Sequence, residues 1–276
     1  IFINIPVIII SGQVELKDMI GKSGTRQIGI QEANIIDLVR PITKYAKTLN
    51  KSSDIEFEIK KAINIATSER PGPVWLDIPL DVQSHKFRVL KSKKILNLKK
   101  KERFNKKIDF NRIYKLICSA YRPVFLIGNG VHISESEKDL HKLIKKIKIP
   151  ILSTWNGSDI IHSNHHLYSG RPGLFGNRLA NFIIQSCDLL IVLGSRLSVP
   201  ITGYQIKNFS PRSKKIYVDI DKKEIVKRGI KIDMAVKTDV GFFIKKINSF
   251  LKRKKEVNKK KWNNELKNLK KSLNED

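Results

Sequence analysis

Residues 70–83 read RPGPVWLDIPLDVQ. The cluster Arg70-Pro71-Gly72-Pro73 ends any helix that precedes it, because proline has no backbone N–H and its ring clashes with the preceding turn. The apolar run VWLDI at 74–78 then predicts a strand that is buried on both faces. Upstream, apolar residues recur at helical spacing between Ile55 and Ala66. A helix that leads into a buried strand predicts an α/β fold with a parallel sheet.

The residues before this helix extend the same pattern. The short β-branched run PVIIIS at 6–11 predicts another buried strand, and residues 30–39 carry apolar positions that suit a helix ended by Pro41. The chain begins at Ile1 rather than Met, inside a strand-like run. We therefore expect it to be a fragment of a longer protein.

A second α/β pattern follows a polar, Lys-rich stretch at 88–108, which is typical of an interdomain linker. Strands are predicted at 123–127, 149–154, 188–193 and 215–218, and helices at 134–148, 177–186 and 240–251. The fold class expected is therefore α/β, with two doubly wound, mainly parallel-sheet domains. Beyond them, Trp262, Leu266, Leu269 and Leu273 form an apolar stripe on a Lys-rich helix. We expect this stripe to dock on a part of the protein outside this chain.

Composition narrows the function. The 276 residues carry 54 Lys+Arg against 26 Asp+Glu, a formal net charge of +28. Lysine is spread along the chain, and no zinc-finger spacing or aromatic-rich RNA-binding strand accompanies it, so we expect a solvated surface and no nucleic-acid partner. No window approaches the length of a membrane span, and two cysteines are too few for a disulfide framework. A reducing cytoplasm is the expected location.

Candidate binding residues lie where predicted strands end. Gly128-Asn129-Gly130 follows one strand and Gly194-Ser195-Arg196 another; Asp219 follows the strand KIYV (215–218), and Asp239 follows the strand-like run MAVK (234–237). In an open α/β sheet, ligands bind beyond the carboxyl ends of the strands. Bare glycine backbone lets a phosphate approach, Arg196 can neutralise one, and an acid can bind ribose. Ordinary turn glycines and helix N-caps are the competing interpretation.

A histidine cluster is the other candidate site in the sequence. His162, His165 and His166 lie in the polar stretch IHSNHHLYSG, but no Cys or closely spaced acid completes a metal shell. The sequence contains no nucleophile elbow and no P-loop. We predict no catalytic residue and no metal ligand within this chain.

Longer motifs carry a family resemblance. The stretch RPGPVWLDIPLDVQ resembles the end of the pyrimidine-binding domain in thiamine-diphosphate enzymes of the acetolactate synthase group. PVIIISGQ (6–13), GIQE (29–32) and PITKYA (41–46) occur upstream in the expected order. RPVFLIGNG (122–130), SGRPGLFGN (169–177), LGSRL (193–197) and VDID (218–221) are similar to the central domain of that group.

The resemblance implies a three-domain enzyme that joins or cleaves C–C bonds next to a 2-keto group. Residues 1–87 would be the C-terminal half of the pyrimidine-binding domain, 88–108 a linker, 109–250 the central nucleotide-binding domain, and 251–276 a helical linker to a pyrophosphate-binding domain. The cofactors implied are thiamine diphosphate with Mg²⁺, and FAD or ADP in the central domain. The activating glutamate and the GDG…N motif of the family would lie outside this chain, so the fragment alone is expected to be inactive. The partners implied are a 2-ketoacid substrate and further copies of the protein, in a homodimer or tetramer.

The resemblance also implies roles for particular residues. Gln31 matches a glutamine that faces the thiamine ring and the substrate. The positions that match the nucleotide site are Arg70, Gly128, Gly130, Thr154, Gly170, Gly194, Arg196, Asp219 and Asp239. Two positions depart from the family pattern: Leu80 replaces a lysine of the substrate channel, and Pro200 replaces an arginine at the edge of the active site. These changes favour an acceptor different from that of acetolactate synthesis. The alternative from another class is a stand-alone nucleotide-binding module without catalysis.

Overall fold

The computed structural model describes residues 4–86, 108–226 and 229–273. The chain divides into two compact units, Ile1–Glu102 and Arg103–Asp276, the first unit and the central unit. The predicted linker at 88–108 lies outside the described residues except for Ile108. None of the helices in the described part of the chain is long and apolar enough to cross a membrane.

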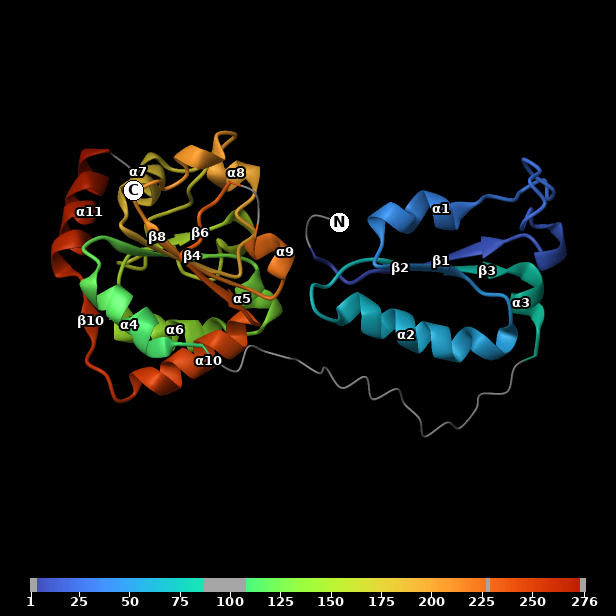
Figure 1. Ribbon diagram of the computed structural model, residues 1–276, viewed down its shortest axis with the longest axis horizontal. Helices are drawn as coiled ribbons and strands as arrows, with labels where there is room; N and C mark the ends of the chain where they lie inside the picture. The colour runs from blue at the N-terminus through green and yellow to red at the C-terminus, as the bar shows by residue number, and fades with distance from the viewer. Residues whose placement is uncertain (1–3, 87–107, 227–228, 274–276) are drawn as a thin grey trace. The chain divides into compact units, whose positions relative to one another are not determined.

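The first unit is built on three parallel strands in the order β1-β3-β2. These are β1 (Ile8–Gln13), β2 (Tyr45–Thr48) and β3 (Val74–Pro79). Helices α1 (Ile35–Val39) and α2 (Ile55–Thr67) lie on opposite faces of the sheet, and α3 (Leu80–Ser84) follows β3 directly (Figure 1). Ala62 and Ala66 of α2 are buried against Val74 and Leu76 of β3. The parallel sheet predicted from residues 70–83 is confirmed.

The helix predicted at 30–39 is only half right, because α1 begins at Ile35. Its N-cap is Asn34, whose side-chain oxygen accepts from the backbone N–H of Asp37 at 3.4 Å. Residues 29–32 form a turn closed by a hydrogen bond from the N–H of Glu32 to the carbonyl of Gly29. The spacing of apolar residues predicted a helix across this turn because such spacing does not mark where a helix begins. The start is marked instead by the N-cap residue Asn34.

The central unit has a five-stranded parallel sheet in the order β6-β4-β7-β8-β9. Its strands are β4 (Pro123–Ile127), β6 (Ile151–Ser153), β7 (Leu189–Leu193), β8 (Lys214–Asp219) and β9 (Met234–Lys237). Its longer helices are α4 (Phe110–Ser119), α6 (Glu137–Lys146), α7 (Arg178–Ser186), α10 (Val240–Leu251) and α11 (Lys260–Ser272), and its short ones are α5 (Gly130–Ile133), α8 (Val199–Thr202) and α9 (Lys222–Ile225).

Helices cover both faces of this sheet (Figure 1). Helices α4, α6 and α10 contribute to one buried cluster, and α7 and α11 to the other. Along β4, Phe125 and Ile127 belong to the first cluster, whereas Val124 and Leu126 belong to the second. Such a strand reads as a continuous apolar run because each of its faces meets a helix layer. The doubly wound α/β class is confirmed.

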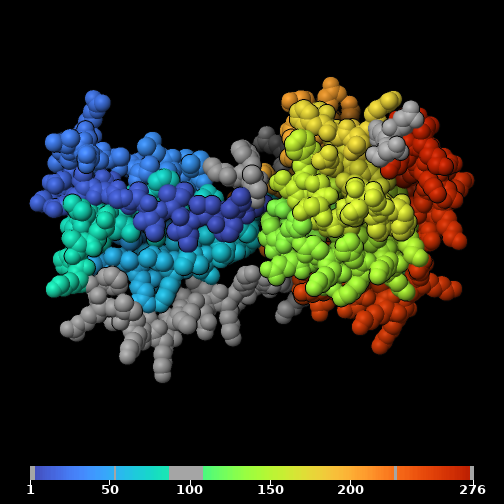
Figure 2. Space-filling view, turned by 180° about the vertical axis from the view of Figure 1, so that it is seen from behind, coloured from blue at the N-terminus to red at the C-terminus, as the bar shows by residue number. Residues whose placement is uncertain are grey.

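The C-terminal stripe packs within the central unit. Trp262 and Leu266 are buried in the same cluster as α7, and Leu269 and Leu273 pack against it. The two-residue strand β10 (Val257–Asn258) pairs with β5 (Ile147–Lys148) just before α11. In Figure 2 the red C-terminal segment lies directly against the green and yellow atoms of this unit. The prediction that the stripe docks outside the chain is wrong, because these apolar side chains cover the central unit's own sheet.

Candidate functional site

The carboxyl edge of the central sheet carries most of the predicted site residues. If the five strands are numbered 1 to 5 along the chain, from β4 to β9, their order across the sheet is 2-1-3-4-5. The connection from β4 to β6 and the connection from β7 to β8 therefore run in opposite directions across the sheet. Such a reversal leaves a crevice between the two strand ends, which is where doubly wound sheets bind ligands. Gly128 and Gly130 follow β4, and Gly194 and Arg196 follow β7. The topology therefore brings these four residues to one place.

The three glycines contact one another through backbone. The N–H of Gly130 donates to the carbonyl of Gly194 at 2.9 Å, and that of Gly128 donates to Leu193 at 3.0 Å. A Cβ on Gly128 would lie 2.5 Å from the carbonyl oxygen of Gly194, and a Cβ on Gly130 would lie 2.7 Å from the Cα of Gly194. Gly194 also has φ +62°, in the left-handed region that favours glycine. The packing of the two turns by itself requires glycine here, so the motif alone does not demonstrate phosphate binding.

Arg196 is held by a carboxylate. Its Nε donates to Oε1 of Glu224 on α9 at 3.1 Å, and Glu224 is largely buried. About a third of the Arg196 side chain is exposed. The guanidinium offers five donors in a planar fork, so an anionic ligand can share it with Glu224. Glu224 was not identified from the sequence, although it lies within one short helix after the VDID motif.

The two acids at the next strand ends differ in environment. Asp219 ends β8, is 5% exposed, and accepts from the N–H of Asp221 at 2.8 Å. Asp239 follows β9 and caps α10, because its carboxylate accepts from the N–H of Phe242 at 2.9 Å. Between them in sequence, Thr238 is buried and its hydroxyl has no hydrogen-bond partner in the structure. A buried polar atom without a partner is costly, and sequence spacing gives no signal for it.

Two further predicted residues lie on loops that follow β6. The N–H of Thr154 donates to Ile127 at 2.9 Å, which places Thr154 beside the end of β4. Gly170 has φ +92° and accepts at its carbonyl from the N–H of Ser153. Beyond them, the exposed rings of Trp155 and Phe175 meet edge to face at 6.1 Å. These loops carry aromatic surface to the same end of the sheet as the glycine turns.

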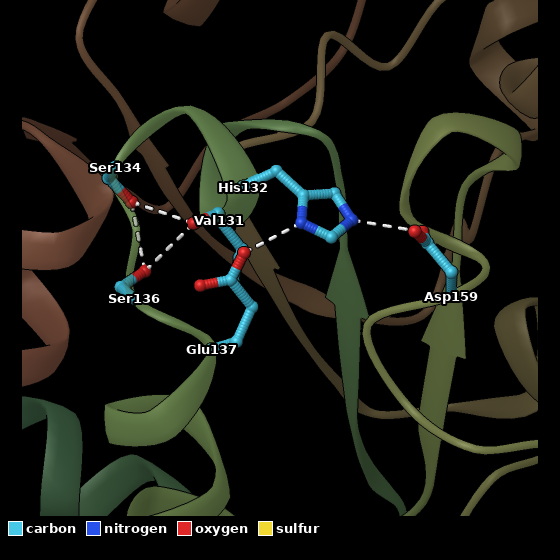
Figure 3. A network of polar contacts seen from close by, with 6 residues as sticks. All are labelled: Val131, His132, Ser134, Ser136, Glu137 and Asp159. Carbon is cyan, nitrogen blue, oxygen red and sulfur yellow. Dashed lines mark hydrogen bonds and ion pairs between the residues drawn. The ribbon is translucent and has the colours of Figure 1, made fainter.

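A histidine between two carboxylates was missed in the sequence (Figure 3). His132 lies on α5, two residues after Gly130, and its Nδ1 is 2.7 Å from Oε1 of Glu137. Its Nε2 is 2.9 Å from Oδ1 of Asp159, in the loop after β6. This His132 bridge, defined by His132, Glu137 and Asp159, joins the β4–α5 turn to that loop. The acids lie 5 and 27 residues away in sequence, so no fixed spacing reveals the bridge.

The two carboxylates favour the charged imidazolium. Burial by itself would lower the pKa of His132, but its hydrogen bonds to Asp159 and Glu137 and their charges outweigh burial and raise the pKa above 6.5. The hydrogen bond with His132 is the main cause that lowers the pKa of Asp159 below 3.8. A backbone hydrogen bond and then His132 lower the pKa of Glu137 below 4.5. The bridge is therefore an ion triad that is complete only while His132 is protonated.

The remaining predicted residues lie in the first unit and in the loop after β6. Gln31 and Arg70 belong to the first unit, where Gln31 is exposed in the turn before α1 and Arg70 follows α2. His165 and His166 stack at 4.6 Å, and burial lowers the pKa of His165. Within the described residues, no group of three or more His, Cys, Asp or Glu side chains could hold a metal ion.

Comparison with known proteins identifies the class to which this doubly wound unit belongs. Residues 110–247 match the family model described as the thiamine pyrophosphate enzyme, central domain, which covers half of the chain. The chain belongs to the thiamine pyrophosphate enzyme family. The resemblance drawn from residues 122–221 is thereby confirmed.

The most similar relatives include acetolactate synthase large subunits. The chain is 35% identical over 238 residues to a probable acetolactate synthase large subunit of Methanocaldococcus jannaschii, covering 85% of this chain and 39% of that protein. It is 34% identical over 246 residues to the corresponding protein of Methanococcus aeolicus, covering 88% of this chain and 40% of that protein. It is 34% identical to an acetolactate synthase of Mycobacterium leprae over 226 residues, covering 81% of this chain and 35% of that protein. The chain spans about two fifths of the length of the first two relatives.

Proposed function

We propose that this chain is part of a thiamine-diphosphate-dependent carboligase or decarboxylase that acts on 2-ketoacids. The observation that carries the proposal is the length of the similarity. A match over 238 residues is too long to lie within the central unit, so it includes much of the first unit as well. A nucleotide-binding module alone would not require similarity in both units. Thiamine diphosphate, when bound, would supply the electron sink for the C–C bond chemistry.

The first unit would contribute to the thiamine site through Gln31. Residues 1–87 would correspond to the C-terminal half of a pyrimidine-binding domain, 109–250 to the central domain, and the chain after 250 would lead to a pyrophosphate-binding domain that holds Mg²⁺. The exposed turn that carries Gln31 lies at the carboxyl end of the sheet, the end where α/β folds bind ligands. Exposed Ile8 and Ile10 on the edge strand β1 support further protein against this unit, consistent with a homodimer or tetramer.

The central unit would bind FAD or ADP at the crevice between β4 and β7. Support comes from the topological reversal, the partly exposed guanidinium of Arg196, and the carboxylates of Asp219 and Asp239 at successive strand ends. A guanidinium suits a phosphate, and carboxylates suit ribose hydroxyls. Gly128, Gly130, Gly194, Thr154 and Gly170 would line this crevice through backbone. Arg70 would assist from the first unit, as the family resemblance implies.

The acceptor would differ from a simple 2-ketoacid. Leu80 begins α3 at the carboxyl end of β3 and is 56% exposed, so an apolar side chain occupies the place of the family lysine. Pro200, within α8, replaces an arginine and has neither a side-chain nor a backbone donor. Neither side chain has a donor for a carboxylate. An acceptor with an apolar, uncharged substituent fits these two positions.

The test of the reaction uses the intact protein that contains this chain. With thiamine diphosphate and Mg²⁺ present, we expect it to consume pyruvate or a longer 2-ketoacid, and to lose this activity when thiamine diphosphate is omitted. Calorimetry should show thiamine diphosphate binding in parallel. Absence of both binding and turnover would contradict the proposal and favour the stand-alone module.

The nucleotide proposal has its own test. Arg196→Ala should weaken FAD or ADP binding by roughly 10- to 150-fold, the effect of losing a charged hydrogen bond. Glu224→Gln removes the competing carboxylate, so it should leave affinity unchanged or raise it. Arg253→Ala, which replaces an exposed arginine two residues after α10, is the matched control for loss of charge. Equal weakening by Arg196→Ala and Glu224→Gln would mean that the pair only stabilises the fold, and no binding by the unmodified protein would remove the claim.

A further inference from the structure

We propose that Asp77 and Gln13 are positioning residues that hold the turn bearing Gln31 at the carboxyl end of the first unit's sheet. This inference rests on the proposed function, in which Gln31 faces the thiamine ring. The path runs from the buried carboxylate of Asp77, through the amide of Gln13, to the backbone of Ala33. No motif in the sequence links these three residues, and the structure brings them together.

Asp77 is the centre of a polar cluster that joins the three strands. Its side chain lies on β3 and the residue is 1% exposed. Its carboxylate accepts from Ser11 Oγ of β1 at 2.6 Å and from Thr48 Oγ1 of β2 at 3.3 Å. Ser11 and Thr48 are the register partners of Asp77 in the neighbouring strands. A buried carboxylate must be satisfied by donors, and here the donors fix its position across the whole sheet.

Gln13 links this cluster to the turn. Its Nε2 donates to Oδ2 of Asp77 at 3.3 Å and to the carbonyl of Ala33 at 2.7 Å. Its Oε1 accepts from the N–H of Val14 at 3.0 Å, so both ends of the amide are engaged. An amide has two N–H donors, and both are used here, one on the sheet and one on the turn. Asp77, Ala33 and the N–H of Val14 together fix the orientation of the Gln13 amide, and the shorter of its two donated bonds is the one to Ala33.

The turn itself is tied down from its other side by Glu32. The carboxylate of Glu32 accepts from the N–H groups of Ile20 at 2.6 Å and Ile28 at 3.2 Å, which lie in the preceding loop. Gln31 directly precedes Glu32 and Ala33, and on its other side the N–H of Gly29 donates to the carbonyl of Asp18 at 2.8 Å; Gln31 itself is exposed. With both flanks held, the backbone of Gln31 has a defined place while its side chain stays accessible. A group that must meet a cofactor within about 0.5 Å needs such support.

A purely structural role for the cluster is the competing explanation, because Asp77 also ties the three strands together. The two roles differ in what Gln13 does. Thr48 and Gln13 each donate one bond of 3.3 Å to Asp77, but only Gln13 also bonds the turn. Gln13→Met, of similar length and without donors, and Thr48→Val, of the same shape, are therefore matched variants. Loss of sheet stability would be common to both, whereas release of the turn would be specific to Gln13→Met.

The experiment combines amide hydrogen exchange and steady-state kinetics on the intact protein. In Gln13→Met we expect exchange across residues 29–34 to accelerate about 5-fold, the effect of losing one hydrogen bond, and kcat with a 2-ketoacid to fall at least about 10-fold while KM changes little. Thr48→Val should leave both readouts near those of the unmodified protein. Gln13→Glu places a second carboxylate beside Asp77 and should reduce kcat further, with partial recovery at low pH, where a protonated Glu can again donate.

Each outcome decides the inference. Unchanged exchange at 29–34 in Gln13→Met would overturn the link to the turn. Accelerated exchange with unchanged kcat, or an equal loss of kcat in Thr48→Val, would overturn the positioning role. If the unmodified protein neither binds thiamine diphosphate nor turns over a 2-ketoacid, the proposed function fails and takes the catalytic role with it. The exchange data would still show whether Gln13 holds the turn, so the two failures are distinguishable.

Discussion

Replacing His132 by Gln should destabilise the central unit in acid and leave it nearly unaffected in base. Gln keeps a neutral hydrogen-bonding side chain on α5 but cannot carry the charge that pairs with Glu137 and Asp159. In the unmodified protein His132 lies 2.7 Å and 2.9 Å from these carboxylates. The pKa of His132 is raised, so its bridge contributes full stability below the unfolded value of 6.5 and loses it as pH rises through the higher folded pKa.

The acids set the lower limit of this window. The pKa values of Glu137 and Asp159 are lowered from 4.5 and 3.8, so their contribution is present above those values and is lost as pH falls through the folded pKa. The difference between the two proteins should therefore be largest between about pH 4.5 and 6.5. His132 and Glu137 are each about one third exposed and Asp159 is mostly exposed, so solvent screens both pairs. Allowing roughly 0.5–1 kcal/mol for each pair gives about 1–2 kcal/mol at pH 5.5.

The assay is urea unfolding at pH 5.5 and pH 9, followed by circular dichroism, with an imidazole titration of the native protein by NMR. His141→Gln, at an exposed position on α6, is the matched control, because it removes an imidazole from the same unit outside the His132 bridge. Because the contribution is electrostatic, 1 M salt should reduce the difference at pH 5.5. The reasoning would be refuted by a difference that grows toward pH 9, or by an imidazole of His132 that titrates below 6.5.

Two further substitutions test the packing. Gly194→Ala should lower the free energy of unfolding by more than the roughly 1–3 kcal/mol expected of Gly203→Ala. Both glycines have positive φ, but a Cβ at Gly194 would lie 2.7 Å from the Cα of Gly130, whereas a Cβ at Gly203 would face open space. Equal losses in denaturant unfolding would contradict the importance of the contact between Gly194 and Gly130. Trp262→Ala should cost about 3–5 kcal/mol, since the residue is 3% exposed in the core, and a cost below about 1 kcal/mol in the same assay would mean that α11 does not belong to the central unit's fold.

The parts of the fold that the sequence predicted are those that local chemistry determines. Apart from Asp77 and Asp188, the runs at 74–78, 123–127 and 188–193 are apolar because helices cover both faces of each sheet, and a break by Gly or Pro follows or precedes each run. The helix at 30–39 was wrong in its first half because Glu32 is anchored to a loop formed by residues 18–28, through the N–H groups of Ile20 and Ile28. That loop is non-local, so periodicity carries no information about it.

The sequence proposed candidate residues only where predicted strands end. Gly128, Gly194, Arg196 and Asp219 lie together at one edge because the carboxyl ends of parallel strands meet there. Glu224, His132 and Thr238 were missed because each acquires its character from a partner, or from the lack of one, that only the folded chain defines. The apolar stripe of α11 was visible in the sequence, but the surface that it covers was not, since a helix pattern states which face is apolar and not what it meets.

The glycines at this edge of the sheet are explained equally well by backbone packing and by ligand binding. Gly128, Gly130 and Gly194 pack backbone against backbone, so any side chain there would separate β4 from β7 whether or not a ligand is bound. A variant such as Gly130→Val would therefore abolish nucleotide binding by distorting the sheet edge, and its loss of binding would say nothing about phosphate contact. Arg196 is different, because its partner Glu224 can be neutralised independently and its side chain is partly exposed. Nucleotide binding is consequently better tested by substituting Arg196 than by substituting the glycines, whose replacement would distort the edge of the sheet.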